Sequence, residues 1–169
     1  MRCPKCDGAV VNSKCLDCGA ESPVKDPPVC IKAAMLETGD LRQLRNLEKT
    51  WSGILYRHHK TLASLRDKIA RLEVERGCVE AGLEMLGRGV EYTKVRYGED
   101  SVEAGHELLK LSDVLMLGLQ SEPQPRTRGR YQSQLCDTLK HAQKIFKLQN
   151  GVESKIYKEI EEKLSLCQS

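Results

Sequence analysis

Four cysteines near the start of the chain have the spacing of a zinc site. Eight of the 169 residues are cysteines, and these four form two CxxC pairs that eight residues separate: Cys3, Cys6, Cys15 and Cys18. Two such pairs can surround one Zn²⁺ ion with four thiolates in a tetrahedron, at Zn–S distances of about 2.3 Å. We therefore predict a zinc knuckle with these ligands. Because four protein ligands leave no open coordination position, the predicted zinc is structural and not catalytic.

The same four cysteines have other possible states: two disulfides, free thiols, or a redox-active CxxC pair. The first residues form no apolar segment of the kind found in a secretory signal, so we expect a reducing compartment, where structural disulfides are disfavoured. A redox CxxC is normally followed by a long helix in a βαβ unit. Lys5 and Lys14 would favour the thiolate form that a metal needs. Zinc is the prediction, with the other states as alternatives.

The residues between the two pairs suit a compact knuckle. Gly8 and Gly19 each follow the end of a CxxC pair closely, and we expect both to adopt positive φ. Residues 9–11 (Ala-Val-Val) predict a short strand that leads into a turn at residues 12–14. The other cysteines lie singly along the chain. We expect Cys78, Cys136 and Cys167 to act as small apolar residues within helices, whereas Cys30, after two prolines, has no clear role.

No arrangement of residues predicts catalysis. His58 and His59 are adjacent and would face different sides of a helix, and His106 and His141 stand alone, so we expect surface or interface histidines. The sequence holds no HExxH, no G-x-S-x-G, no phosphate loop and no G-x-G-x-x-G motif. The charged runs at 73–76 and 159–163 read as solvated helix surfaces.

Three arginines alternate near the middle of the chain: Arg126, Arg128 and Arg130. They fall at the end of, or just after, a polar stretch with two prolines, residues 118–129, that we expect to be the one long loop. A basic loop of this kind could hold a phosphate or an acidic peptide, but a flexible basic loop without a ligand is the simpler interpretation. The sequence does not decide its role.

Composition limits the class of protein. Apolar residues make up 40% of the chain, charged residues 30% and aromatic residues only 4%, so the core must consist of aliphatic side chains, which favours packed helices. No apolar stretch is long enough to cross a membrane. The net charge of +3 is too small to indicate nucleic-acid binding, and the knuckle lacks aromatic residues for base stacking. We expect a protein of the cytoplasm, the nucleus or both.

The chain divides into a knuckle, a linker and a helical domain. We assign residues 1–20 to the zinc knuckle, residues 21–28, with three prolines, to a linker, and residues 29–169 to helices. Apolar residues recur at helical spacing over six ranges: 41–58, 62–72, 79–97, 104–115, 135–146 and 157–167. Helices of roughly 15–20 residues with short turns predict a mainly α fold, an antiparallel array like that of tetratricopeptide repeats.

Capping signals and a weak repeat support this division. Asp40 and Asp100 each resemble the first residue of a capping box, and Gly77, Gly98 and Gly151 fit the left-handed position after a helix. A shift of 53 residues aligns four pairs of identical residues: Lys94 with Lys147, Gly98 with Gly151, Ser101 with Ser154, and Leu111 with Leu164. We interpret the domain as a divergent helical repeat.

Several of these segments resemble a known enzyme family. Residues 92–101 (YTKVRYGEDS), continuing to the ELLKL of 107–111, resemble the C-terminal helical region of SET and MYND domain-containing protein-lysine methyltransferases. Residues 144–148 (KIFKL) with Gly151 resemble a second such unit. The opening CPKC and CLDC resemble the extra zinc knuckle that follows the SET core in the family's fourth member. The order of knuckle, proline-rich joint and helices also matches, over nearly the whole chain.

The resemblance implies the C-terminal region of such an enzyme and not its catalytic part. In the family, the SET core binds S-adenosylmethionine and the target lysine and carries an inserted MYND finger, and the 169 residues contain neither. The helical region closes one side of the substrate cleft and binds partner proteins. Whether this chain belongs to an enzyme therefore stays open, and we expect it to be inactive alone. The alternative is a stand-alone zinc-knuckle adaptor that binds proteins, to which Lys94, Arg96 and Lys110 could contribute. The partner and the oligomeric state stay open.

Overall fold

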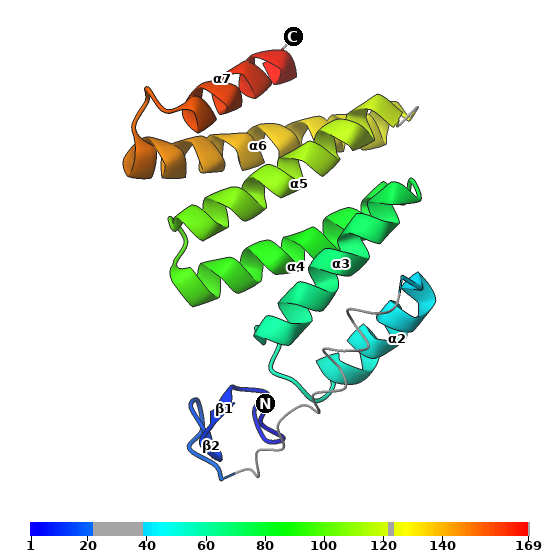
Figure 1. Cartoon of the computed structure of the whole chain (residues 1–169), viewed down its shortest axis with the longest axis vertical. Coiled ribbons are helices and arrows are strands. Elements are labelled where there is room, and N and C mark those ends of the chain that lie inside the picture. Colours follow the sequence, from blue (N-terminus) through cyan, green and yellow to red (C-terminus); the bar gives the residue numbers. More distant parts are fainter. Residues whose placement is uncertain (22–38, 122–123, 169) are drawn as a thin grey trace. The chain divides into compact units, whose positions relative to one another are not determined.

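The computed structural model describes residues 1–21, 39–121 and 124–168 (Figure 1). The chain forms two compact units, Met1–Ile69 and Ala70–Ser169. The described residues contain two short strands and six helices, so the prediction of a mainly α fold after a four-cysteine knuckle is confirmed. Apart from Glu21, the predicted linker lies outside the described residues, as does Cys30.

The knuckle is built on a small hairpin. Strands β1 (Val10–Val11) and β2 (Lys14–Cys15) pair antiparallel, with Val10 opposite Cys15. The two residues between the strands, Asn12 and Ser13, have φ values of 49° and 63°. Two consecutive left-handed residues form the tight turn whose twist matches that of the paired strands. The predicted strand and turn are therefore confirmed, except that Lys14, predicted in the turn, begins strand β2.

The first helix within the described residues is shorter than its apolar spacing predicts. Helix α2 spans Leu41–Ser52, and helix α3 spans Lys60–Glu75. The predicted continuation to His58 is wrong, because the backbone N–H groups of Ile54 and Leu55 both donate to the Trp51 carbonyl and close the helix. Leu55 is fully buried in the turn that follows, so its apolar character serves the turn and not a helix. The predicted cap at the start of α2 is confirmed, since Asp40 Oδ1 accepts the Arg42 N–H at 2.9 Å.

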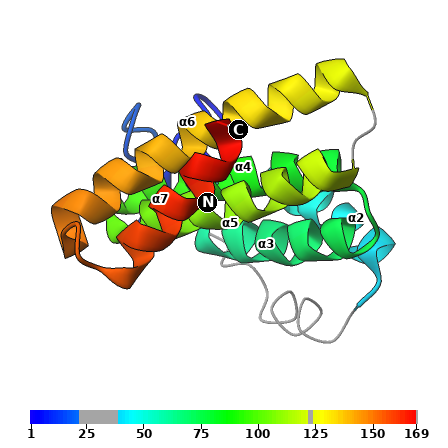
Figure 2. The same cartoon turned by 90° about the horizontal axis from the view of Figure 1, so that it is seen from above.

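The second unit is an array of antiparallel helices. Helices α4 (Val79–Tyr97), α5 (Val102–Ser121), α6 (Pro125–Asn150) and α7 (Lys155–Gln168) each pack on the next, and α6 and α7 lie side by side in both views (Figures 1 and 2). Their shared core is mainly aliphatic, as the composition predicts. Among its fully buried side chains are Leu115, Leu135, Leu139, Ile145 and Phe146.

Two glycines let helix α5 approach its neighbours closely. A Cβ atom on Gly105 would lie 2.9 Å from ring atoms of Phe146, and one on Gly118 would lie 2.9 Å from the ring of Tyr131. Ordinary carbon contacts are longer, at about 3.5–4.0 Å, so a side chain at either position would push α6 away. Gly118 does not begin a loop, as its neighbouring prolines predicted, because α5 continues to Ser121.

The two connections related by the 53-residue shift have the same structure. Gly98 and Gly151 have positive φ values of 104° and 78°, as predicted. Three residues later, the hydroxyls of Ser101 and Ser154 donate back to these glycine carbonyls, at 2.9 and 2.8 Å. Each serine oxygen also accepts a backbone N–H three residues further on, from Ala104 at 3.1 Å and from Tyr157 at 3.4 Å. The repeat is thus a structural one at these turns.

The prediction that Asp100 caps helix α5 is wrong. Ser101 is the cap, and the Asp100 carboxylate instead accepts hydrogen bonds from Lys144 Nζ on α6, at 3.0 and 3.2 Å. A serine oxygen directly before the helix competes better for the orphan N–H groups than a carboxylate one residue further away. No helix in the described part of the chain is long and apolar enough to cross a membrane.

Candidate metal centre

Two loops of similar shape bring the four cysteines together. In each loop the first cysteine is buried and the second is exposed, Cys3 before Cys6 and Cys15 before Cys18. The carbonyl of Cys3 accepts the N–H of Asp7 at 3.0 Å, and the carbonyl of Cys15 accepts the N–H four residues later at 3.1 Å. The loops are thus equivalent around a common centre.

Each loop turns at a left-handed residue four positions after its first cysteine. These residues are Asp7, with a φ of 63°, and Gly19, with a φ of 70°. The prediction of positive φ is confirmed for Gly19 but wrong for Gly8, because the preceding aspartate takes that conformation. Aspartate tolerates it better than most residues. Gly8 lies close to the second loop, since a Cβ atom there would lie 2.2 Å from the Asp17 carboxylate and would displace that side chain.

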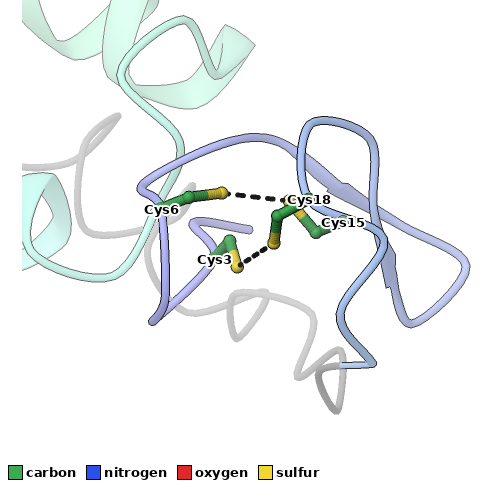
Figure 3. Close-up of side chains that lie close together, drawn as sticks. All are labelled: Cys3, Cys6, Cys15 and Cys18. Atoms are coloured by element: carbon green, nitrogen blue, oxygen red, sulfur yellow. Dashed lines mark hydrogen bonds between the residues drawn. The ribbon is translucent and has the colours of Figure 1, made fainter.

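The four sulfur atoms have the spacing that a zinc ion requires. All lie within 4.8 Å of one another, with 3.8 Å between Cys3 and Cys18 and 3.5 Å between Cys6 and Cys15 (Figure 3). A tetrahedron with Zn–S bonds of about 2.3 Å has sulfur–sulfur edges of about 3.8 Å. A disulfide requires about 2.05 Å, so these sulfurs are free thiols. The donor set fits a metal ion and is compatible with zinc, which four thiolates can hold in a tetrahedron.

The thiols differ in acidity because their surroundings differ. The backbone N–H of Cys18 is the main group that lowers the pKa of Cys15, to about 7, against the opposing effect of burial. For Cys6, the backbone N–H of Gly8 lowers the pKa, but hydrogen bonds with the other three thiols together raise it to about 12. The thiols therefore share protons that a bound metal ion would displace, which makes metal binding depend on pH.

The remaining cysteines and the histidines form no second cluster of this kind within the described residues. Cys167 is buried and Cys136 packs against the same core, as predicted. Cys78 is exposed and precedes α4, so its predicted place inside a helix is wrong. His106 lies edge-on to the ring of Phe146, with 5.2 Å between centroids, in keeping with a packing role.

The predicted basic loop is helical. Arg126, Arg128 and Arg130 lie in the first turns of α6, because Pro125 begins the helix with a φ angle already suited to it. Arg130 pairs with Glu80 of α4, whose carboxylate also accepts the hydroxyl of Tyr131 at 2.8 Å. One of the three arginines therefore joins two helices of the array, and the hypothesis of a flexible loop is wrong.

Sequence reasoning missed two buried charged groups. Glu73 was assigned to a solvated surface, but its side chain is only 1% exposed. It stands four residues after Ile69, on the apolar face of α3, and that spacing could have revealed it. The second group is Arg66, which pairs with Glu48 of α2 at 2.9 Å in a largely buried position. Its partner lies 18 residues away, beyond the reach of a periodic pattern.

The chain is similar to part of known protein-lysine N-methyltransferases. No family model matches the chain. The protein-lysine N-methyltransferase SMYD4 of Mus musculus is 30% identical over 95 residues, which is 54% of this chain, and that of Gallus gallus is 27% identical over 104 residues, or 62%. The chain is distantly homologous to one region of SMYD4. The SMYD4 of Pongo abelii extends the match to 135 residues, 69% of this chain, at 27% identity. The chain covers only 12–17% of the length of these SMYD4 relatives.

Proposed function

We propose that this chain forms the zinc-knuckle and helical region of a SET and MYND-type protein-lysine N-methyltransferase. Two findings support the proposal: the homology to part of SMYD4, and the four thiols at the spacing of a tetrahedral zinc site. The homology carries the assignment to this type of enzyme. The thiol cluster carries the structural zinc site, because four cysteine donors leave no open coordination position.

Zinc would hold together a segment that has little core of its own. The buried apolar cluster of the knuckle consists of Cys3, Val10 and Cys15, with Met1 and Ala20 packed against it. A core of this size cannot offset the conformational entropy of ordering about 20 residues. Metal ligation supplies the missing free energy and couples binding to folding. Cys3, Cys6, Cys15 and Cys18 would be the ligands.

The helical array would serve as a wall of the substrate cleft and as a surface for partner proteins. Two exposed apolar residues occupy equivalent positions of the repeat, Val95 at 61% exposure and Leu148 at 67%. Lys94 and Lys147 stand next to them, also at equivalent positions. Exposed apolar side chains at regular positions of a helical repeat are typical of binding surfaces. We place the protein in the cytoplasm, the nucleus or both.

The partner surface can be tested by charge substitution. We expect Val95→Glu with Leu148→Glu to abolish cross-links to partner proteins in cells that make the full-length protein. Leu117→Glu, on an exposed apolar residue of α5 outside the repeat-equivalent pair, is the matched control and should leave the cross-links intact. If the double variant recovers partner proteins at the wild-type level, the Val95 and Leu148 positions have no binding role.

The methyltransferase and adaptor hypotheses predict different coding sequences upstream of the Met1 codon. Sequencing the transcript upstream of the Met1 codon should reveal an in-frame extension that encodes a SET core and a MYND finger. Protein made from that extended frame should transfer labelled methyl groups from S-adenosylmethionine to protein lysines, and the 169-residue polypeptide should not. An in-frame stop directly upstream would instead favour the adaptor, and transfer by the 169 residues alone would contradict the assignment.

A further inference from the structure

A backbone hydrogen bond next to the predicted ligand Cys3 joins the zinc knuckle to the turn between α2 and α3. The backbone N–H of Arg2 donates to the carbonyl of Ile54 at 3.1 Å. Arg2 directly precedes Cys3 and also forms a bridge with Ala9, next to strand β1. A cavity of about 370 Å³, lined by residues of the knuckle and of the α2–α3 region, lies beside this link. The position of the Ile54 carbonyl therefore bears on the position of the first CxxC loop.

The turn that carries Ile54, residues 53–59, has little regular structure of its own. It is closed at one end by N–H groups that donate to the Trp51 carbonyl, and at the other by the His59 N–H, which donates to the Tyr56 carbonyl at 2.8 Å. Between these ends, Arg66 of α3 reaches back and donates from Nη1 to the carbonyl of Arg57 at 3.0 Å. The Arg66 side chain thus holds the turn at Arg57, two residues after the buried Leu55.

Arg66 is itself held in one orientation by a buried network. Its Nε donates to Glu48 Oε1 at 2.9 Å, its Nη2 reaches Ser52 Oγ at 3.4 Å, and the Ser52 hydroxyl donates to the same glutamate oxygen at 2.9 Å. The side chains of Arg66 and Glu48 are only 8% and 13% exposed. Three donors of one planar guanidinium thus join the end of α2, the turn and α3, which a lysine ammonium could not reproduce.

We propose that Arg66 is a positioning residue for the zinc site: it fixes the 53–59 turn, and the turn fixes the first CxxC loop through the Ile54 carbonyl. This inference rests on the proposed zinc site. Outer groups that orient metal ligands typically contribute 10- to 100-fold to metal affinity. Because coupling between two equilibria is reciprocal, bound zinc must in turn stabilise the turn.

The first test measures zinc affinity by competition with a chromophoric chelator. Arg66→Met removes the guanidinium at similar length, and we expect zinc to bind roughly 10-fold more weakly. Arg66→Lys keeps the charge beside Glu48 but cannot bond the Ser52 oxygen and the Arg57 carbonyl together, so its affinity should be intermediate. Arg71→Met is the matched control on the same helix, since the Arg71 side chain is 69% exposed and pairs only at the surface; its affinity should match that of the wild type.

The second test uses the wild-type protein, in case Arg66→Met fails to fold. Removal of zinc with a chelator should speed amide hydrogen exchange in residues 53–59, while exchange in α5 and α6 stays unchanged. Equal zinc affinity for Arg66→Met and wild type, or turn amides that do not respond to zinc, would overturn the positioning role and leave the zinc site intact. Failure of the wild type to bind zinc at all would overturn both.

Discussion

At the residue scale, the knuckle depends on a close contact between its two loops. Gly8 faces Asp17, and a Cβ atom at Gly8 would lie 2.7 Å from the Asp17 Cγ as well as 2.2 Å from its carboxylate oxygen. We expect Gly8→Ala to displace the exposed Asp17 side chain, to cost about 1 kcal/mol of stability and to weaken zinc binding. Thermal unfolding and chelator competition measure the two effects.

Two companion variants test this explanation. Asp17→Ala in the Gly8→Ala background removes the nearest atoms and should restore most of the lost affinity. Gly87→Ala, inside α4 where the added Cβ would meet no atom within 4 Å apart from its chain neighbours and the nearby helix backbone, should instead stabilise the protein by roughly 0.5–1 kcal/mol. If Gly8→Ala binds zinc as tightly as the wild type, the space argument for Gly8 is wrong.

At the scale of helices and turns, the two equivalent connections depend on their serines. Ser101 and Ser154 each satisfy a free N–H at a helix start and bond back to the glycine before it. We expect Ser101→Ala and Ser154→Ala each to lower the free energy of unfolding by about 1 kcal/mol, as is typical for loss of an N-cap. Urea denaturation followed by circular dichroism provides the measurement.

Asp100→Ala separates the observed cap from the one that the sequence predicted. The carboxylate is half-exposed and pairs with Lys144 at the surface, so its loss should cost about 0.5 kcal/mol or less. A larger loss for Asp100→Ala than for Ser101→Ala would mean that the carboxylate is the cap after all.

The helices were largely predictable, whereas their ends were not. Apolar residues at helical spacing predicted α3 to α7, because burial of one face dominates the choice of helix. The same spacing extended α2 wrongly to His58 through Ile54, which is 40% exposed in the turn after the helix, because apolar spacing does not distinguish a turn residue from a helical one. Glycine and proline predicted a loop from Gly118, but that glycine serves close helix packing. Only tertiary contacts settle such cases.

At the scale of the whole molecule, three tyrosines should make the fold sensitive to alkali. Burial is the largest of the causes that raise the pKa of Tyr92, Tyr131 and Tyr157 above the ordinary value of 10. The folded state therefore keeps protons that the unfolded state releases above about pH 10, so stability is full below that pH and falls as the pH rises through it. Urea midpoints at about pH 8 and about pH 10.5 should show the loss.

Tyr131→Phe serves as the control for this effect. It removes the hydroxyl that donates to Glu80, so the variant should be less stable at neutral pH but should lose less stability in alkali. A urea midpoint that stays constant across this pH range in the wild type would contradict the role of the buried tyrosines.

As with the helices, part of the candidate site could be predicted from residue spacing, and part depends on the folded structure. The two CxxC pairs predicted that the four cysteines cluster, because a CxxC spacing is itself a local geometric constraint. The left-handed Asp7 and the contact of Gly8 with Asp17 depend on how the two loops face each other. Arg66 and Glu48 lie on two different helices and are 18 residues apart in the sequence, so no local pattern could predict their contact.

The most direct measurement for the whole account is the metal content of the purified protein by mass spectrometry under native conditions. We expect one zinc ion per chain, lost on treatment with a chelator and strongly reduced in Cys15→Ser, while Cys78→Ser, on an exposed cysteine outside the cluster, retains it. Protein that carries no metal, or a mass lower by four hydrogens from two disulfides, would contradict the zinc knuckle and the function proposed from it.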